Sequence, residues 1–286
     1  MTRFRKRVDL GGAGTKHCGA WLDHGISARG TCGSCRASPS RSPHLDITTT
    51  TLTWQVHPDV PRLLDDILDW YDAEVPQAER HVTVRAADDD ALRRLAVHGY
   101  RLDEQAAGDA GFWTQCNRRD LRDLPEPTLP AGFSFLTAGQ VSPEAAAHAH
   151  RDAWHPSSFT DHGMRGVRAT WPYQPDLHAL VQAPDGTLAA TTIMWLDERN
   201  GTAEFEPVGT HQDYRRLGLA RSLLQYGMLQ AIKAGATEML VACLGAPAHP
   251  TARALYYDTG FREFTRERPH VKVAIAADSR KAGTPS

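Results

Sequence analysis

One stretch decides the fold predicted for this chain, and it reads Val208-Gly209-Thr210-His211-Gln212-Asp213-Tyr214-Arg215-Arg216-Leu217-Gly218-Leu219-Ala220. Residues 203–208 have the composition of a strand, and after the turn apolar residues recur at helical spacing as far as Ile232. A helix N-terminus binds anions through unpaired backbone N–H groups and a partial positive charge. Gly218 lets a phosphate approach the backbone closely, and Arg215 and Arg216 add positive charge. The stretch therefore predicts a phosphate-binding turn between a strand and a helix.

The spacing Arg215-x-x-Gly218-x-Ala220 resembles the acyl-CoA pyrophosphate loop of the GNAT family of N-acetyltransferases. Farther along, Ala252-Arg253-Ala254-Leu255-Tyr256-Tyr257-Asp258-Thr259-Gly260-Phe261 resembles the late helix of that family. Residues 238–244, between the two motifs, are predicted to form a buried strand. The resemblance covers residues 133–276. It implies an α/β chain with the GNAT acyl-CoA N-acyltransferase fold, a mixed central sheet flanked by helices.

The resemblance also implies which residues hold acetyl-CoA, the co-substrate that donates the acetyl group. The strand before the turn should splay from its neighbour, so that the backbone of Val208, Gly209 and Thr210 pairs with the acyl-pantetheine. The pyrophosphate should lie on the turn itself, formed by Arg215, Arg216, Leu217, Gly218, Leu219, Ala220 and Arg221. His249 stands where the family often has an Asn that contacts pantetheine or water. The histidine either takes over this contact or the contact is lost.

Acetylation of an amine needs a proton acceptor, because a free alkylamine has a pKa of about 10 and is mostly protonated at neutral pH. Glu204 and Glu206 are two apart on a predicted strand and share one face, and Glu206 is the favoured acceptor. The departing thiolate benefits from a proton donor. The resemblance implies a tyrosine near the CoA sulfur at Tyr256, with Tyr257 as the weaker candidate. The alternatives are a packing role for the tyrosine and a solvated strand face for the glutamates.

The remaining sequence predicts the domain organisation. Residues 125–132 are a proline-rich linker, and residues 133–276 form the catalytic domain. Within that domain we expect a strand at 133–136, a helix that begins after Ser142 and ends near Trp154, and a hairpin of residues 176–182 and 188–195. Residues 277–286 are predicted to be disordered.

Residues 46–124 are predicted to form an α/β lobe with a strand at 51–56, a helix at 60–71, a strand at 81–85, a helix at 90–98 and a strand at 112–117. In this lobe Leu95-x-x-x-Gly99-Tyr100 is similar to the late-helix motif, one residue shorter. The lobe is therefore either a degenerate partial GNAT unit or an unrelated α/β extension. It lacks Arg-x-x-Gly-x-Ala, so we expect no CoA there.

Composition limits the other functions. Residues 1–45 are rich in Lys, Arg, Gly and Ser without periodicity, which predicts a disordered tail. The single Cys32-x-x-Cys35 pair lacks matching ligands, so no metal site is expected. The net charge of −2 argues against nucleic-acid binding, and no apolar run could span a membrane. Five sparsely placed cysteines are typical of a reduced, cytoplasmic protein.

These observations predict an N-acetyltransferase that moves an acetyl group from acetyl-CoA to a primary amine of a small molecule by direct attack in a ternary complex. Two alternatives stay open at this point. The chain is a non-catalytic acyl-CoA-binding module, or it acetylates an amine of a protein. The sequence does not give the oligomeric state.

Overall fold

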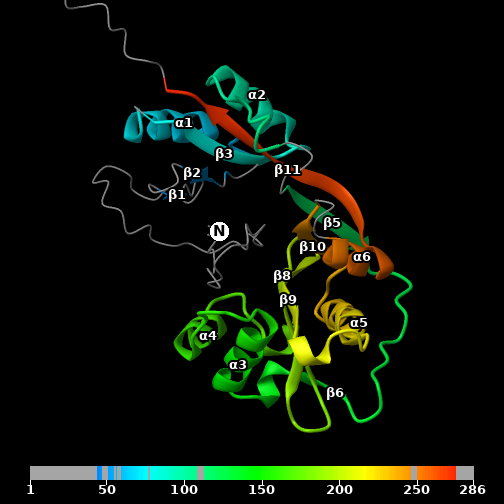
Figure 1. Ribbon diagram of the computed structural model, residues 1–286. Coiled ribbons are helices and arrows are strands. Elements are labelled where there is room, and N and C mark those ends of the chain that lie inside the picture. The colour runs from blue at the N-terminus through cyan, green and yellow to red at the C-terminus, as the bar shows by residue number, and fades with distance from the viewer. Residues whose placement is uncertain are drawn as a thin grey trace, which may run out of the picture. The chain divides into compact units, whose positions relative to one another are not determined.

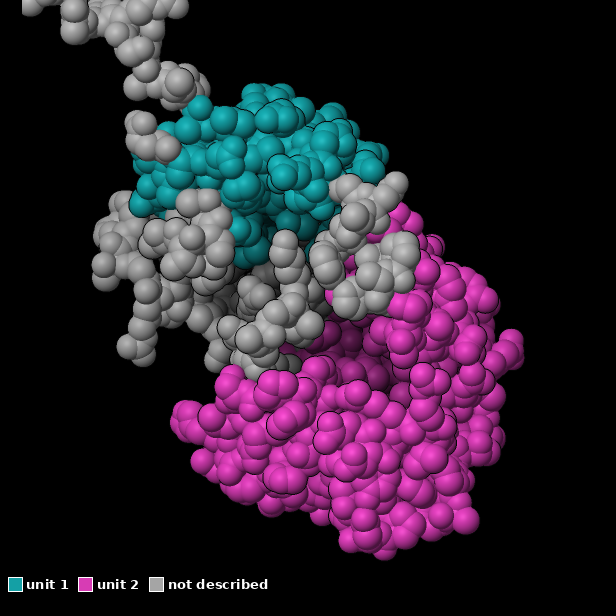
Figure 2. All heavy atoms as spheres, in the orientation of Figure 1, with its two compact units in different colours: residues 1–3, 27–111, 267–286 teal, residues 4–26, 112–266 magenta. Residues whose placement is uncertain are grey.

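The structure is a computed structural model that describes residues 44–46, 51–54, 56, 59–76, 78–107, 113–245 and 250–274. The described residues fall into two compact units (Figure 2). The first unit lies within residues 27–111 and 267–286, and the second lies within residues 112–266. Each unit has its own buried core, so each is described by itself.

The second unit is built around a mixed sheet with the strand order β11-β5-β10-β9-β8-β7-β6. Adjacent strands of this sheet pair antiparallel, except that β9 and β10 run parallel. The strands are β5 (Thr114–Asp120), β6 (Ser134–Thr137), β7 (His178–Gln182), β8 (Leu188–Asp197), β9 (Thr202–Thr210), β10 (Glu238–Leu244) and β11 (Arg262–Lys272). This mixed sheet is the one that the resemblance predicts.

Helices cover both faces of this sheet. Figure 1 shows α3 and α4 on one side of β8 and β9 and α5 on the other. The helices are α3 (Pro143–Ala153), α4 (Asp161–Arg168), α5 (Leu219–Lys233) and α6 (Pro250–Asp258), with short 3-10 helices at Ala138–Gln140, Pro175–Leu177 and Gln212–Tyr214. Helix α3 begins as the sequence predicts, because Ser142 Oγ accepts a hydrogen bond from Ala145 N and Pro143 stands at the first turn.

The core that positions the site lies between α5 and the sheet. Leu223, Leu224 and Met228 of α5 are fully buried, and they pack with Met194 of β8 and Phe205 of β9. Gly227 lies on the same face of the helix, and a Cβ there would come within 2.7 Å of the Phe205 ring. The missing side chain therefore brings α5 close to β9, and the start of the helix is held at the end of that strand.

The first unit repeats part of this order. Its elements are β1 (His44–Asp46), β2 (Thr51–Thr53), α1 (Leu63–Glu74), β3 (Arg80–Arg85), α2 (Asp89–Val97) and β4 (Arg101–Leu102). Strands β2 and β3 run parallel with α1 between them in the chain, as β9 and β10 do with α5. A second helix and another strand follow in both units. The shared order favours a degenerate GNAT-like lobe over an unrelated extension.

Several elements differ from their predicted bounds. The strand predicted at 112–117 within the N-terminal lobe is β5, which pairs with β10 and β11 of the second unit. Helix α4 was not predicted, since Gly163 and Gly166 weaken its helical pattern. The strand predicted from residue 176 begins at His178, after a 3-10 turn. Strand β1 overlaps the end of the predicted tail, while Cys32-x-x-Cys35 and residues 277–286 lie outside the described residues.

The last part of β11 belongs to the first unit. Residues 267–272 pair antiparallel with β3, and Lys272 Nζ forms an ion pair with Asp72 of α1. Asp72 also forms an ion pair with Arg80, with Nε 3.3 Å from the carboxylate, and accepts a hydrogen bond of 3.4 Å from the Tyr100 hydroxyl. Because Arg80 and Tyr100 are buried, one carboxylate holds together α1, β3 and the C-terminal strand.

Lys272→Met is expected to destabilise the first unit by about 1–2 kcal/mol, because it removes a charged hydrogen bond from a largely buried cluster. Urea unfolding followed by tryptophan fluorescence measures the change. Lys233→Met is the matched control, since Lys233 is exposed at the end of α5. Equal unfolding midpoints for the two variants would show that the ion pair contributes nothing.

Candidate active site

The gap in the sheet lies between β9 and β10. Their parallel pairing runs from Thr202 beside Glu238 to Phe205 beside Val241, and it stops there. Strand β9 nevertheless continues to Thr210 and β10 to Leu244. Among the described strands, none pairs with the backbone of β9 beyond Phe205 on its β10 side, and an extended ligand can pair with it there. The separation that the resemblance implies is confirmed.

A β-bulge shapes β9 at the start of this gap. Phe205 pairs with Met194 and Val208 pairs with Thr192, so Glu206 and Pro207 together oppose one residue of β8. Pro207 has no N–H and cannot donate to a neighbouring strand. A bulge bends a strand and redirects its side chains. Glu206 thus lies where β9 turns away from β10.

The two glutamates lie on the face of β9 opposite the buried Ala203 and Phe205. Glu206 is half-buried, and burial raises the pKa of its carboxyl to about 8, with a further contribution from the charge of Glu204. Among the described residues, none donates a hydrogen bond to the Glu206 carboxylate. Glu206 therefore changes its protonation state just above neutral pH, where a general base is effective.

Tyr256 lies across the gap on α6. Its side chain is 7% exposed and packs edge-on against Phe261, with ring centroids 6.0 Å apart. Burial raises the pKa of its hydroxyl, and the nearby Glu206 carboxylate raises it further. Within the described part of the chain no group hydrogen-bonds to this hydroxyl. It stays protonated at neutral pH and is available as a donor. The Tyr257 hydroxyl instead accepts a hydrogen bond of 2.8 Å from Gln115 Nε2.

The phosphate turn has the backbone that its sequence predicts. Gly218 precedes α5 in the left-handed conformation, with φ of 78°, and a Cβ there would meet no protein atom within 4 Å. Leu219 is buried and anchors the first helical residue, whereas Leu217 is exposed. Arg216 also has a positive φ, of 69°. The glycine therefore borders open space at the helix N-terminus, where an anion is favoured.

The arginines of the turn have different surroundings. Arg215 braces the turn, because its guanidinium donates to Thr210 O at 3.2 Å and to Ala153 O of α3 at 3.3 Å. Arg216 is exposed beside Gly218. Arg221 forms an ion pair of 3.0 Å with Asp258 at the end of α6. The turn is thus tied to α3 and to α6.

Gly209 and His150 both pack against Trp154. A Cβ at Gly209 would lie 2.4 Å from the Trp154 ring. The close packing of Trp154 is therefore enough by itself to require a glycine at this position. Trp154 in turn stacks on His150, with ring centroids 4.5 Å apart. His150 is thereby a packing residue of α3. His249, the predicted pantetheine contact, lies outside the described residues.

The equivalent helix of the first unit has the opposite charge at its start. Helix α1 carries Asp65 and Asp66 in its first turn, whereas the first turn of α5 has no acidic residue. Carboxylates at a helix N-terminus repel a phosphate and occupy the positive end of the dipole. The contrast supports the expectation that CoA binds only in the second unit.

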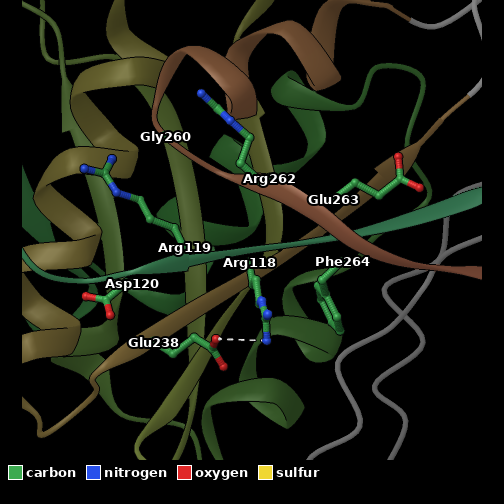
Figure 3. A pocket seen from close by; sticks show the side chains of 8 residues that line it. All are labelled: Arg118, Arg119, Asp120, Glu238, Gly260, Arg262, Glu263 and Phe264. Carbon is green, nitrogen blue, oxygen red and sulfur yellow. Dashed lines mark ion pairs between the residues drawn. The ribbon is translucent and has the colours of Figure 1, made fainter. Parts of the chain in front are cut away.

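Two arginines that no sequence motif reveals hold α6 in place. Arg119 of β5 donates to Thr259 O, and Arg262 donates to Tyr257 O at 3.0 Å and to Phe261 O at 2.6 Å. Both cap the C-terminal end of α6, where cations are favourable. Figure 3 shows them in a cavity of about 550 Å³ lined by Arg118, Arg119, Asp120, Glu238, Gly260, Arg262, Glu263 and Phe264. The bond from Arg119 could not be predicted because β5 is far from α6 in the sequence, whereas Arg262 follows α6 directly at the start of β11.

Among the described residues, no cluster of three or more His, Cys, Asp or Glu side chains is arranged to hold a metal ion. None of the described helices is both long enough and apolar enough to span a membrane.

Known proteins resemble this chain in sequence profile and in fold. Residues 145–261 match the profile of a family described as "Acetyltransferase (GNAT) family". No curated protein sequence matches the chain. Among solved structures, an N-acetyltransferase of the same family from Sphaerobacter thermophilus has a TM-score of 0.58 at 21% identity, covering 82% of this chain and 76% of its own.

Two other structures show the same fold. A tandem GNAT protein from the clavulanic acid biosynthesis pathway has a TM-score of 0.56 at 17% identity, covering 80% of this chain and 77% of its own. A GNAT-family acetyltransferase from Colwellia psychrerythraea has a TM-score of 0.56 at 11% identity, covering 81% of this chain and 80% of its own. The profile match and the mixed sheet together lead to one conclusion: the chain carries a domain of the acetyltransferase (GNAT) family and is an acyl-transferring enzyme.

Proposed function

We propose that this enzyme transfers an acetyl group from acetyl-CoA to a primary amine of a small molecule, by direct attack in a ternary complex. One observation carries the proposal: at the gap between β9 and β10, Glu206 lies close enough to Tyr256 that its carboxylate raises the pKa of the tyrosine hydroxyl. A proton acceptor and a proton donor are the two groups that amine acetylation requires.

The second unit offers a path for acetyl-CoA that ends at these two residues. The pyrophosphate fits at Gly218, beside Arg216 and the first N–H groups of α5. The pantetheine arm fits along the backbone of Val208, Gly209 and Thr210, which lacks a β10 partner. The thioester then reaches the start of the gap, where Glu206 and Tyr256 are found.

Each residue handles one proton in this proposal. Glu206 accepts the proton that the amine must lose before its nitrogen attacks the thioester carbonyl. Glu204 adds negative charge on the same face and attracts the cationic form of the amine. Tyr256 donates its hydroxyl proton to the CoA sulfur as the carbon–sulfur bond breaks, and the second proton that the amine nitrogen loses as the amide forms restores the tyrosine hydroxyl. Cys243 is a poor alternative nucleophile, because burial raises the pKa of its thiol.

The alternatives make different demands on the same residues. A non-catalytic acyl-CoA-binding module would need the gap and the turn but neither Glu206 nor Tyr256. An enzyme for protein amines would need an open surface for a peptide beside Glu204 and Glu206. The raised pKa of the Glu206 carboxyl favours a catalytic site over a binding module.

Tyr256→Phe separates the enzyme from the binding module. The variant should bind acetyl-CoA with unchanged affinity, because only a hydroxyl is lost, while kcat falls about 10²-fold, the lower end for a general acid. Calorimetry measures the affinity, and release of free CoA thiol with a panel of amines measures kcat. Tyr257→Phe is the control, since its hydroxyl faces Gln115. Wild-type turnover in Tyr256→Phe would assign the tyrosine to packing alone.

A further inference from the structure

A buried tryptophan is bonded to the backbone of the proposed base. Trp195 lies on β8, is 4% exposed, and donates its indole N–H to the main-chain oxygen of Glu206 at 2.8 Å. Trp195 is paired in register with Glu204, one pleat before the bulge. The bond therefore crosses from the regular part of the β8–β9 ladder to the residue at which the ladder is interrupted.

The bulge explains why this bond matters. Between the pairs Phe205–Met194 and Val208–Thr192, two residues of β9 oppose one residue of β8, so the ladder is locally disrupted. Pro207 cannot supply a backbone donor. A side-chain donor from Trp195 takes the place of a ladder bond at Glu206. This fixes the backbone of Glu206 at the point where β9 leaves β10.

The indole itself is held firmly. It belongs to a buried cluster with α3 and α4, formed by Ala146, Ala147, Phe159, Met164, Val167, Ile193 and Trp195. The Tyr173 ring lies edge-on to it, with centroids 6.4 Å apart. A large ring packed on several sides has one orientation available, so its N–H points at one place. The position of Glu206 is thus set by the packing of α3 and α4.

We propose that Trp195 is a positioning residue for Glu206, which keeps the carboxyl group of that residue at the gap between β9 and β10. The proposal rests on the proposed function only for its effect on rate. Its effect on the carboxyl group can be tested without turnover. Without the indole N–H, the bulge relaxes, the Glu206 side chain moves toward water, and the amine loses its nearby proton acceptor.

The direct test is the titration of Glu206 by NMR, with carboxyl-labelled glutamate and a signal assigned by its loss in Glu206→Gln. Among the described residues, the charged or titratable groups that face this carboxyl are Glu204 of β9 and Tyr256 of α6, and both remain in every variant. In the wild type the midpoint is expected at about 8. In Trp195→Phe it should fall by about one pH unit, as water reaches the carboxylate.

The kinetic test is a double-mutant cycle on the full chain. Trp195→Phe should lower kcat about tenfold with the KM for acetyl-CoA unchanged, as expected for one lost hydrogen bond. In the Glu206→Gln background the same substitution should have less than a twofold effect, since there is no carboxylate left to position. Trp171→Phe, at an exposed tryptophan, is the control.

If Trp195→Phe unfolds, a benzothienyl-alanine at position 195 keeps the shape of the indole and removes only its N–H. An unchanged Glu206 midpoint, or an equal loss of kcat with and without the Glu206 carboxylate, overturns the positioning role. An enzyme that acetylates no amine, yet shows the shifted midpoint, contradicts the proposed function and leaves Trp195 as the residue that positions Glu206.

Discussion

Gly218→Val should lower the affinity for acetyl-CoA at least about 100-fold. Gly218 has φ of 78° at the start of α5, a conformation that valine adopts only with strain. Its branched side chain would also fill the open space beside the helix N-terminus, where the phosphate is expected. Backbone strain and steric blockage should therefore both lower the affinity for acetyl-CoA.

A matched glycine separates these two effects. Gly235, just after the other end of α5, has φ of 99° and likewise no protein atom within 4 Å of an added Cβ. Gly235→Val should be destabilised to a similar degree and keep the wild-type affinity. Calorimetry at a temperature where both variants are folded measures the difference. Equal affinities for the two variants would place the pyrophosphate away from this turn.

Glu206→Gln is expected to lower kcat about 10²–10³-fold at pH 8, because it removes the proton acceptor but keeps the size of the side chain. In the wild type the rate should rise with pH through about 8, as Glu206 ionises. In the variant this rise should disappear and leave only the increase that follows the amine's own ionisation. The affinity for acetyl-CoA should be unchanged.

The same substitution should stabilise the protein at high pH. The pKa of Glu206 rises from 4.5 to about 8 on folding, so the folded state holds a proton that the unfolded state releases between these values. Ionisation therefore costs stability as the pH rises through this window, and the cost is complete above pH 8. Glu206→Gln should match the wild-type melting temperature at pH 4.5 and exceed it at pH 9.

Glu206→Gln is thus expected to lower kcat and to raise the melting temperature at pH 9. A variant that merely misfolds would lose both activity and stability, so the two measurements together exclude misfolding. Glu204→Gln is the control, because Glu204 lies on the same face one pleat away. It should lower the rate less and give a smaller gain in stability. A Glu206→Gln variant with wild-type kcat, or one less stable than the wild type at pH 9, would show that Glu206 is not the proton acceptor.

The phosphate turn and the late helix could be predicted because their signals are local. Gly218 at a helix start and Tyr256 in its motif need no knowledge of distant residues. Pro207 likewise marks the splayed strand by its missing N–H. The position of β5 could not be predicted, since its pairing with β10 joins residues more than a hundred positions apart.

The residues that support the site could not be predicted either, because their contacts also depend on how separate elements pair in the fold. The bond from Trp195 to Glu206 depends on the register of β8 and β9, and a one-residue change in register would break it. Arg119 resembles any strand arginine until Thr259 O is placed beside it. Helix α4 had one usable signal, the Thr160 cap with Met164 and Val167 buried one turn apart.

The most direct test of the account is a single assay on the wild-type chain. Acetyl-CoA is incubated with a panel of small primary amines at pH 8, and both free CoA thiol and acetylated amine are quantified by mass spectrometry. The account predicts equal amounts of thiol and acetylated amine for at least one acceptor, and formation of both products about 10²–10³-fold more slowly with Glu206→Gln. Thiol release without any acetylated amine, or turnover at the wild-type rate in Glu206→Gln, would contradict it.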